Sequence, residues 1–185
     1  MSEPRLLVFA GPNGSGKTTV TRGVSTVGVY VNADDIKAET GCSDLAAAQA
    51  AERAREALLE KRADFTFETV LSTDRNLDLL RRAKAAGYEI TSMFVLTASA
   101  WINVGRVRTR VDDGGHDVPE DKIRVRYGRS LANLPALIDL SDDTVVIDNT
   151  ADGPVRIFAR DFNGEIIIAT PYWSEERIRR LVSGA

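Results

Sequence analysis

A glycine-rich loop that ends in lysine and threonine occupies residues 11–18, which read Gly-Pro-Asn-Gly-Ser-Gly-Lys-Thr. Glycines let the backbone wrap closely around phosphate oxygens, because they adopt φ angles that other residues resist. Successive N–H groups and the start of the next helix then present partial positive charge to an anion. In this pattern the lysine reaches the β- and γ-phosphates and the threonine hydroxyl contacts Mg²⁺. The loop therefore predicts binding of a nucleoside triphosphate with Mg²⁺.

The residues expected to contact the nucleotide form one continuous segment. They are Gly11, Pro12, Asn13, Gly14, Ser15, Gly16, Lys17, Thr18 and Thr19. Among them, Lys17 is also a catalytic candidate and Thr18 is the candidate metal ligand. The alternative is a glycine turn followed by a chance lysine. That alternative fits poorly with an apolar strand directly before the loop and a helix directly after it.

Acidic residues follow two predicted strands at the edge where a phosphoryl acceptor would bind. Phosphoryl transfer needs a group that orients and deprotonates the attacking hydroxyl, and open α/β sheets bind ligands at the carboxyl ends of their strands. Asp34 and Asp35 follow the second strand, and Glu68 ends the third. We take Asp34 as the candidate base, and Asp34 with Glu68 as candidate substrate contacts. The alternatives are N-capping by Asp34 or Asp35 of a short helix that follows them directly, and a structural role for Glu68.

Basic residues crowd two successive predicted helices within residues 106–129. They are Arg106, Arg108 and Arg110 on the first helix, and Lys122, Arg124, Arg126 and Arg129 on the second. A glycine-containing loop with the only histidine, His116, joins the helices. Two basic helices joined in this way are typical of a lid whose arginines neutralise phosphate charge. The alternative is a set of solvated faces paired with acids such as Glu120 and Asp121. The catalytic candidates here are Arg110, Arg126 and Arg129.

Strands and helices alternate along the first 150 residues. Strands are predicted at 6–10, 29–31, 65–68, 89–96 and 144–147, and helices at 17–23, 43–63, 74–86, 98–111 and 119–134. This order predicts an α/β fold with a mostly parallel sheet of five strands and helices on both faces. Asp148, after the fifth strand, is either a second metal-binding carboxylate or a turn residue.

The last 30 residues follow a different pattern. Asn163-Gly164 separates strand-like residues 155–160 and 165–170, which predicts an antiparallel hairpin at the sheet margin. A closing helix is expected at 174–181. No linker or repeat is visible, so we expect one domain, 1–185, with a lid-like segment at about 106–129 and the C-terminal hairpin and helix at about 155–183.

Composition narrows the class of protein. The chain has 185 residues and a formal net charge of −3, which gives no electrostatic case for nucleic acid. Its single cysteine, Cys42, cannot form an internal disulfide, and no apolar run reaches the ~20 residues that span a bilayer. We therefore expect a cytoplasmic protein with no nucleic-acid and no membrane partner.

Several motifs together resemble those of the zeta toxin family of P-loop kinases, in particular its short stand-alone members, over roughly residues 5–150. The motifs are the loop at 11–18, Val31-Asn32-Ala33-Asp34, Phe67-Glu68-Thr69, Gly114-Gly115-His116-Asp117-Val118-Pro119, Arg126-Tyr127-Gly128-Arg129-Ser130-Leu131, and Asp148-Asn149. The loop is generic to many NTPases. The glycine-glycine-histidine segment followed by the arginine helix is much more specific.

The resemblance implies a nucleoside-kinase-like fold with parallel strands in the order 2-3-1-4-5. It also implies ATP or GTP with Mg²⁺, Asp34 as general base, Glu68 as the acid of the third strand and Arg129 as a phosphate-binding arginine. A second such arginine falls near His116 or Arg110, and His116 is a candidate substrate contact. Well-known members phosphorylate UDP-N-acetylglucosamine on a sugar hydroxyl, and many are toxins held in check by a small antitoxin.

We therefore expect a Mg²⁺-dependent phosphotransferase that phosphorylates a hydroxyl of a small molecule. By resemblance, that molecule is UDP-N-acetylglucosamine and the protein is the toxin of a toxin–antitoxin pair. Two alternatives stay open at this point. One is a non-toxic small-metabolite kinase, and the other is a nucleotide-binding regulatory module without phosphotransfer.

Overall fold

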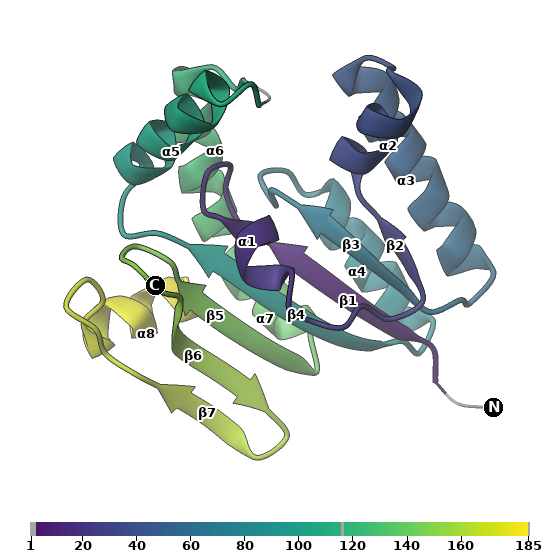
Figure 1. Ribbon diagram of the computed structural model, residues 1–185. Coiled ribbons are helices and arrows are strands. Elements are labelled where there is room, and N and C mark those ends of the chain that lie inside the picture. Colours follow the sequence, from purple (N-terminus) through teal and green to yellow (C-terminus); the bar gives the residue numbers. More distant parts are fainter. Residues whose placement is uncertain (1–2, 116, 185) are drawn as a thin grey trace.

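A seven-stranded sheet runs through the computed structural model, which describes residues 3–115 and 117–184 (Figure 1). The strands are β1 (Arg5–Ala10), β2 (Val29–Val31), β3 (Phe65–Thr69), β4 (Glu89–Leu96), β5 (Asp143–Asp148), β6 (Val155–Asp161) and β7 (Gly164–Ile167). Their order is β2-β3-β1-β4-β5-β6-β7. The first five strands are parallel, whereas β6 pairs antiparallel with β5 and β7 with β6. The α/β fold and the order 2-3-1-4-5 are confirmed, and the predicted hairpin extends the expected five strands to seven.

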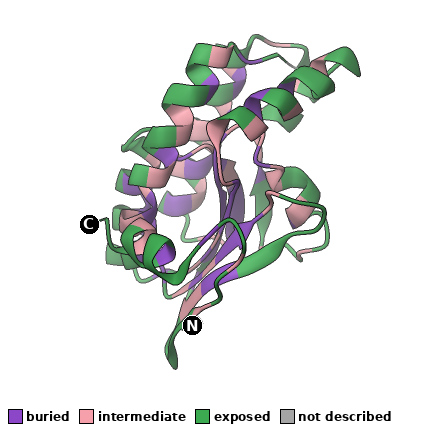
Figure 2. Cartoon of the chain, turned by 90° about the vertical axis from the view of Figure 1, so that its left-hand side faces the viewer, coloured by how far each residue is buried: buried purple, intermediate pink, exposed green. Residues whose placement is uncertain are grey.

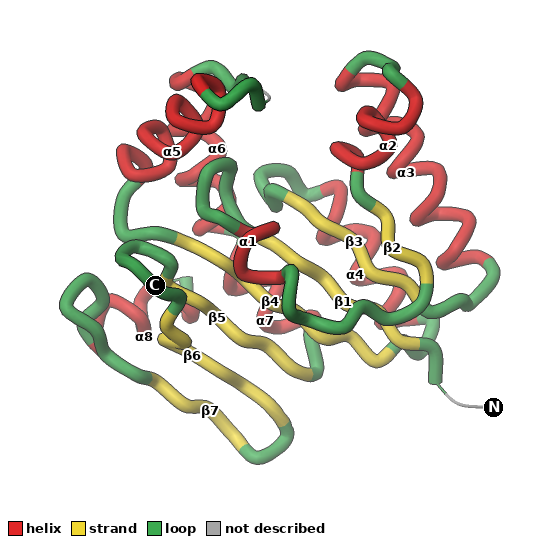
Figure 3. Tube along the Cα trace, in the orientation of Figure 1, coloured by secondary structure: helices red, strands yellow, loops and turns green. Residues whose placement is uncertain are grey.

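The helices lie on both faces of the sheet and beyond its carboxyl edge (Figure 3). They are α1 (Lys17–Thr21), α2 (Ala33–Thr40), α3 (Asp44–Glu60), α4 (Arg75–Ala85), α5 (Ala100–Asp112), α6 (Glu120–Ala132), α7 (Leu134–Leu140) and α8 (Glu175–Ser183). Among the described residues, no helix has the length and apolarity that crossing a membrane requires.

Helix α7 is the element that the sequence prediction missed. The sequence predicts one helix over residues 119–134. In the structure α6 ends at Ala132, and α7 begins at Leu134 with Pro135 in its first turn. A proline tolerates the first turn, because the N–H that it lacks has no partner within the helix there. Leu134, Leu137 and Ile138 are buried, so α7 is held by the apolar core.

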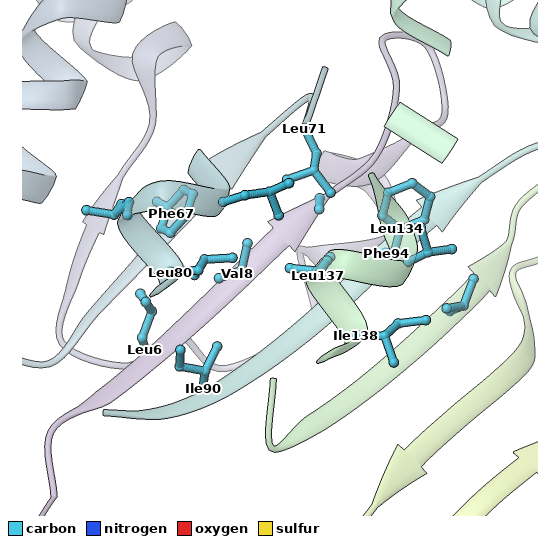
Figure 4. Packing of buried hydrophobic residues seen from close by; sticks show 14 of the residues in the cluster. Leu6, Val8, Phe67, Leu71, Leu80, Ile90, Phe94, Leu134, Leu137 and Ile138 are labelled. Atoms are coloured by element: carbon cyan, nitrogen blue, oxygen red, sulfur yellow. The ribbon is translucent and has the colours of Figure 1, made fainter. Parts of the chain in front are cut away.

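The main core lies on one face of the sheet, between the strands and helices α3, α4, α7 and α8 (Figure 4). Along β1, Leu6 and Val8 point into this core, whereas Phe9 is buried on the opposite face near α1. Such alternation follows from the two-residue period of a strand. Figure 2 shows the buried strands between more exposed helices. The core therefore fixes the strands from which the glycine-rich loop and Glu68 project.

Two helix pairs stand beyond the carboxyl ends of the strands, on either side of α1 and the glycine-rich loop (Figure 1). One pair is α2 with α3, and the other is α5 with α6. The α5–α6 pair has its own small apolar cluster, made of Val104, Val107, Val118 and Ile123. This cluster is separate from the main core, so the pair packs internally and carries its arginines as a unit.

Candidate active site

The glycine-rich loop leaves β1 and enters α1 through positive φ angles at Gly11, Gly14 and Gly16, which are 141°, 76° and 83°. These angles favour glycine because a side chain would be strained there. A Cβ atom on Gly14 would lie 2.5 Å from the carbonyl oxygen of Asn103, and one on Gly16 would lie 2.3 Å from Nδ2 of Asn149. The glycines are thus required both by backbone conformation and by close neighbours.

Side chains from distant parts of the chain brace this loop. Asn149, after β5, donates from Nδ2 to the Ser15 carbonyl at 2.8 Å, and Asn103 of α5 donates to the Asn13 carbonyl at 2.7 Å. The backbone N–H of Gly11 donates to the carbonyl of Thr69 at 3.2 Å. Because these bonds fix the loop carbonyls, they hold the loop in one conformation before any ligand binds.

Lys17 lies at the start of α1 and folds back over the loop. Its ammonium donates to the carbonyl oxygens of Gly11 at 2.7 Å and Pro12 at 3.4 Å. Burial lowers the pKa of the Lys17 ammonium to about 8, whereas the negative charges of Glu68 and Asp34 act to raise this pKa. The positive charge of Arg110 acts to lower it. The charges from β3, α2 and α5 therefore converge on the lysine of the loop.

Asp34 is exposed in the first turn of α2, but it does not cap that helix. The cap is Asn32, whose side-chain oxygen accepts a hydrogen bond from the Asp34 backbone N–H at 2.9 Å. The capping alternative for Asp34 and Asp35 is therefore wrong. Within the described part of the chain, the Asp34 carboxylate has no ion pair and no hydrogen-bond donor, so it is available to a substrate hydroxyl.

Glu68 is half-buried near the carboxyl end of β3, opposite Phe9 of β1. Its Oε1 atom accepts a hydrogen bond from the Tyr30 hydroxyl of β2 at 2.7 Å. We find no cation within ion-pair distance of Glu68 among residues 3–115 and 117–184. The carboxylate is therefore held by a neutral donor.

The predicted catalytic arginines differ in their relation to the loop. Arg126 of α6 is half-buried and donates to the Asn13 side chain at 3.4 Å. Arg110, near the end of α5, is exposed, and its charge acts on Lys17. Arg129 lies one turn after Arg126 and is also exposed. Arg126 thus contacts the loop directly.

Arg106 also approaches the loop, although the sequence did not predict a catalytic role for it. Its guanidinium donates to the carbonyl of Thr150 at 3.4 Å and would lie 3.8 Å from a Cβ atom placed on Gly16. By contrast, Arg108 pairs with Glu120 at 2.6 Å, and Arg124 lies over the Trp101 ring at 4.6 Å. These two arginines follow the alternative interpretation, in which basic residues pair on the outside of the helices.

Metal binding would depend on the nucleotide as much as on the protein. No group of three or more His, Cys, Asp or Glu residues able to hold an ion occurs among the described residues. Mg²⁺ usually binds through few protein groups together with substrate phosphates. Thr18 and Thr19 are exposed at the start of α1, so their hydroxyls fit this mode of binding.

Two other residues were candidates for the site. Asp148 accepts a hydrogen bond from the Thr150 N–H at 3.0 Å, which supports its interpretation as a turn residue. His116 lies outside the described residues.

Asn103, Asn149 and Tyr30 are the site neighbours that were not selected as site residues. Asn149 belongs to a motif that carried the resemblance, but its contact with the loop was not expected. Asn103 is a fully buried polar residue within a helix, and such a residue needs a hydrogen-bond partner. The burial of Asn103 is visible only in the structure, so the sequence offered no signal for this contact.

Comparisons with solved structures find the same fold elsewhere. The chain matches AvrRxo1-ORF1:AvrRxo1-ORF2, a complex also solved with ATP, with a TM-score of 0.74 and 16% identity over 98% of this chain. It spans 64% of the length of that chain. It also matches the PezAT chromosomal toxin–antitoxin system of Streptococcus pneumoniae, with a TM-score of 0.59 and 15% identity over 100% of this chain and 80% of the other.

Sequence comparison supplies the family. An uncharacterized protein of Haemophilus influenzae is 25% identical over 129 residues, which make up 66% of this chain and 92% of the relative. The sequence model of the zeta toxin family matches residues 1–161. Since that match covers the loop, both helix pairs and all five parallel strands, the protein belongs to the zeta toxin family.

Proposed function

We propose that this protein is a Mg²⁺-dependent kinase that transfers the γ-phosphate of ATP or GTP to a hydroxyl group of a small molecule. The observation that carries the proposal is the convergence of charge on Lys17. The carboxylates of Asp34 and Glu68 and the guanidinium of Arg110 all act on this ammonium. A phosphate-binding loop that faced only solvent would fit nucleotide binding alone, whereas nearby carboxylates and an arginine fit transfer to an acceptor.

Each residue of the site has a proposed role in the transfer. The loop amides and Lys17 bind the β- and γ-phosphates. Asp34 takes the proton of the acceptor hydroxyl. The hydroxyl oxygen forms a bond to the γ-phosphorus as the bond between the γ-phosphorus and the oxygen that bridges to the β-phosphate breaks. Arg110, Arg126 and Arg129 neutralise the charge of the transferring group. Thr18 would hold Mg²⁺, which would supply further neutralisation of that charge.

The acceptor and the partner are proposed from the relatives. PezAT is a toxin–antitoxin system, and AvrRxo1-ORF1:-ORF2 was solved with ATP. These two observations support the proposal that this protein uses ATP and acts as a toxin that a small antitoxin protein holds in check. UDP-N-acetylglucosamine is the first acceptor to test, because well-known members of the family phosphorylate it.

The proposal is tested by incubating the purified protein with ATP or GTP, Mg²⁺ and UDP-N-acetylglucosamine, and in parallel with a bacterial metabolite extract. Mass spectrometry then identifies any product that has gained a phosphate. We expect a phosphorylated hydroxyl compound with the wild type and none with Lys17→Ala. Lys61→Ala is the matched control, since Lys61 is exposed at the end of α3, near the start of β3.

The possible results separate the open alternatives. Nucleotide binding without any phosphorylated product would refute a kinase and favour a regulatory module. A phosphorylated product without Lys17-dependent growth arrest, when the protein is expressed alone in bacteria, would favour a non-toxic metabolite kinase. Turnover that survives in Lys17→Ala would show that the loop is not the triphosphate site.

A further inference from the structure

Tyr30 belongs to a chain of hydrogen bonds that joins the Glu68 carboxylate to the first turn of the helix that carries Asp34, although β2 carries it on an edge of the sheet. Tyr30 is paired with Thr66 of β3 in the parallel register, and Glu68 follows two residues later on the same face of β3. The Tyr30 hydroxyl donates to Oε1 of Glu68 at 2.7 Å and accepts from Nδ2 of Asn32 at 3.2 Å. Asn32 in turn caps the helix that carries Asp34.

The direction of these hydrogen bonds is fixed by their chemistry. The Oδ1 atom of Asn32 accepts from the Asp34 N–H, so the amide nitrogen of Asn32 must face Tyr30. The Tyr30 hydroxyl, which accepts a hydrogen bond from this amide, has one O–H to donate, and it donates that hydrogen bond to Glu68. Burial, followed by the hydrogen bond to Glu68, raises the pKa of Tyr30, so the hydroxyl keeps this proton at neutral pH.

Among the residues that the structure describes, one oxygen of Glu68 accepts a hydrogen bond and the other has no donor. Tyr30 occupies Oε1, and the described residues place no donor on Oε2 and no ion pair on the carboxylate. Lys17 donates to loop carbonyls instead, although the charge of Glu68 acts on it. A carboxylate held in this way accepts a hydrogen bond from a hydroxyl or N–H group and disfavours a second anion.

We propose that Tyr30 is a positioning residue, which fixes the Glu68 carboxylate so that its free oxygen binds a hydroxyl or N–H group of the phosphoryl acceptor. This inference rests on the proposed kinase function. The terminal torsion of a glutamate side chain is only loosely constrained, and the positive charge of Lys17 attracts the carboxylate. The Tyr30 hydroxyl keeps Glu68 directed toward the acceptor instead.

The test compares Tyr30→Phe with the wild type. The substrate is UDP-N-acetylglucosamine or, if that compound is not phosphorylated, the compound that the wild type phosphorylates in the metabolite extract. The substitution removes one hydroxyl from a side chain that is 37% exposed, so we expect an unchanged melting midpoint. We expect the acceptor KM to rise about tenfold, as loss of one hydrogen bond to a charged group predicts. The kcat and the KM for ATP should stay within about twofold.

Two further variants show whether Tyr30 acts through Glu68. In a Glu68→Ala background, adding Tyr30→Phe should change the acceptor KM by less than about twofold, because residues that act through one contact are not additive. Tyr172→Phe is the matched control, since Tyr172 is 46% exposed and lies just before α8, outside the site. It should behave like the wild type.

The outcomes distinguish failure of this inference from failure of the proposed function. If the wild type transfers phosphate and Tyr30→Phe has an unchanged acceptor KM, Tyr30 does not position Glu68. An equal rise in both backgrounds would show that Tyr30 acts independently of Glu68. If the wild type phosphorylates no compound at all, the proposed kinase function fails, and the assignment of Tyr30 fails with it.

Discussion

Replacing Lys17 with methionine should stabilise the protein without ligand at neutral pH while abolishing turnover. Burial lowers the pKa of Lys17 from 10.5 to about 8 in the native state. Each pKa unit corresponds to about 1.36 kcal/mol, so the buried charge costs the native state roughly 3 kcal/mol at neutral pH. Methionine fills similar space without a charge but loses the short hydrogen bond from the ammonium to the Gly11 carbonyl and the longer one to the Pro12 carbonyl, a loss of about 1.5 kcal/mol for a charged donor. The expected net gain is therefore about 1.5 to 2 kcal/mol.

The pH dependence of this difference tests its cause. Between about pH 8 and the unfolded pKa of 10.5, the unfolded wild type binds more protons than the native state, so its stability rises with pH. Below that window the cost of burying the charge is fully present. Relative to Lys17→Met, the wild type should gain about 1.3 kcal/mol from neutral pH to about pH 9, and about 2.5 kcal/mol by about pH 10. The stabilising effect of methionine therefore shrinks as the pH rises.

Urea unfolding at a series of pH values measures this difference. Tryptophan fluorescence can follow the transition, because Trp101 is exposed and Trp173 is buried. Lys61→Met serves as the control, since Lys61 is exposed and its substitution should give a profile parallel to that of the wild type. Parallel profiles for the wild type and Lys17→Met would refute the argument, because they would show that Lys17 has an ordinary pKa in the native protein.

Two other substitutions test the proposed base and the brace of the loop. Asp34→Asn should lower kcat for phosphoryl transfer at least about 100-fold, as loss of a general base predicts, and leave ATP affinity near that of the wild type; near wild-type transfer in a coupled ADP assay would remove Asp34 as the base. Asn149→Ala should lower the unfolding free energy by about 1 to 2 kcal/mol, because the Ser15 carbonyl loses the hydrogen bond that the Asn149 amide donates. The same variant should bind ATP more weakly in a calorimetric titration, and unchanged affinity would contradict the brace.

Much of the fold could be predicted because the signals are local. The apolar strand before Gly11, the alternation of strands and helices and the Asn163-Gly164 turn each act within a few residues, and the parallel order and the hairpin are confirmed. Helix α7 was missed because it follows α6 after one residue and is too short for a periodic signal of its own. Its seven residues are helical mainly because Leu134 and Leu137 fill the core above the sheet.

The chemical type of the candidate site was also available from the sequence, since a lysine behind a glycine-rich loop and acids at strand ends suit one class of ligand. The contacts that surround these residues could not be predicted from the sequence. Asn149 lies 134 residues from the carbonyl that it holds, and Arg126 lies 113 residues from Asn13. No short-range pattern encodes contacts across such separations.

By itself, then, the sequence determined the loop, the order of the elements and the residue types at the carboxyl edge, because backbone conformation and strand periodicity depend on nearby residues. Only the tertiary structure decided which side chains meet there. It showed that Tyr30 holds Glu68, that Asn32 caps the helix of Asp34 and that Arg126 contacts the loop. It also decided the lowered pKa of Lys17, because burial and the charges around an ammonium exist only once folding has brought residues of β3, α2 and α5 near the start of α1.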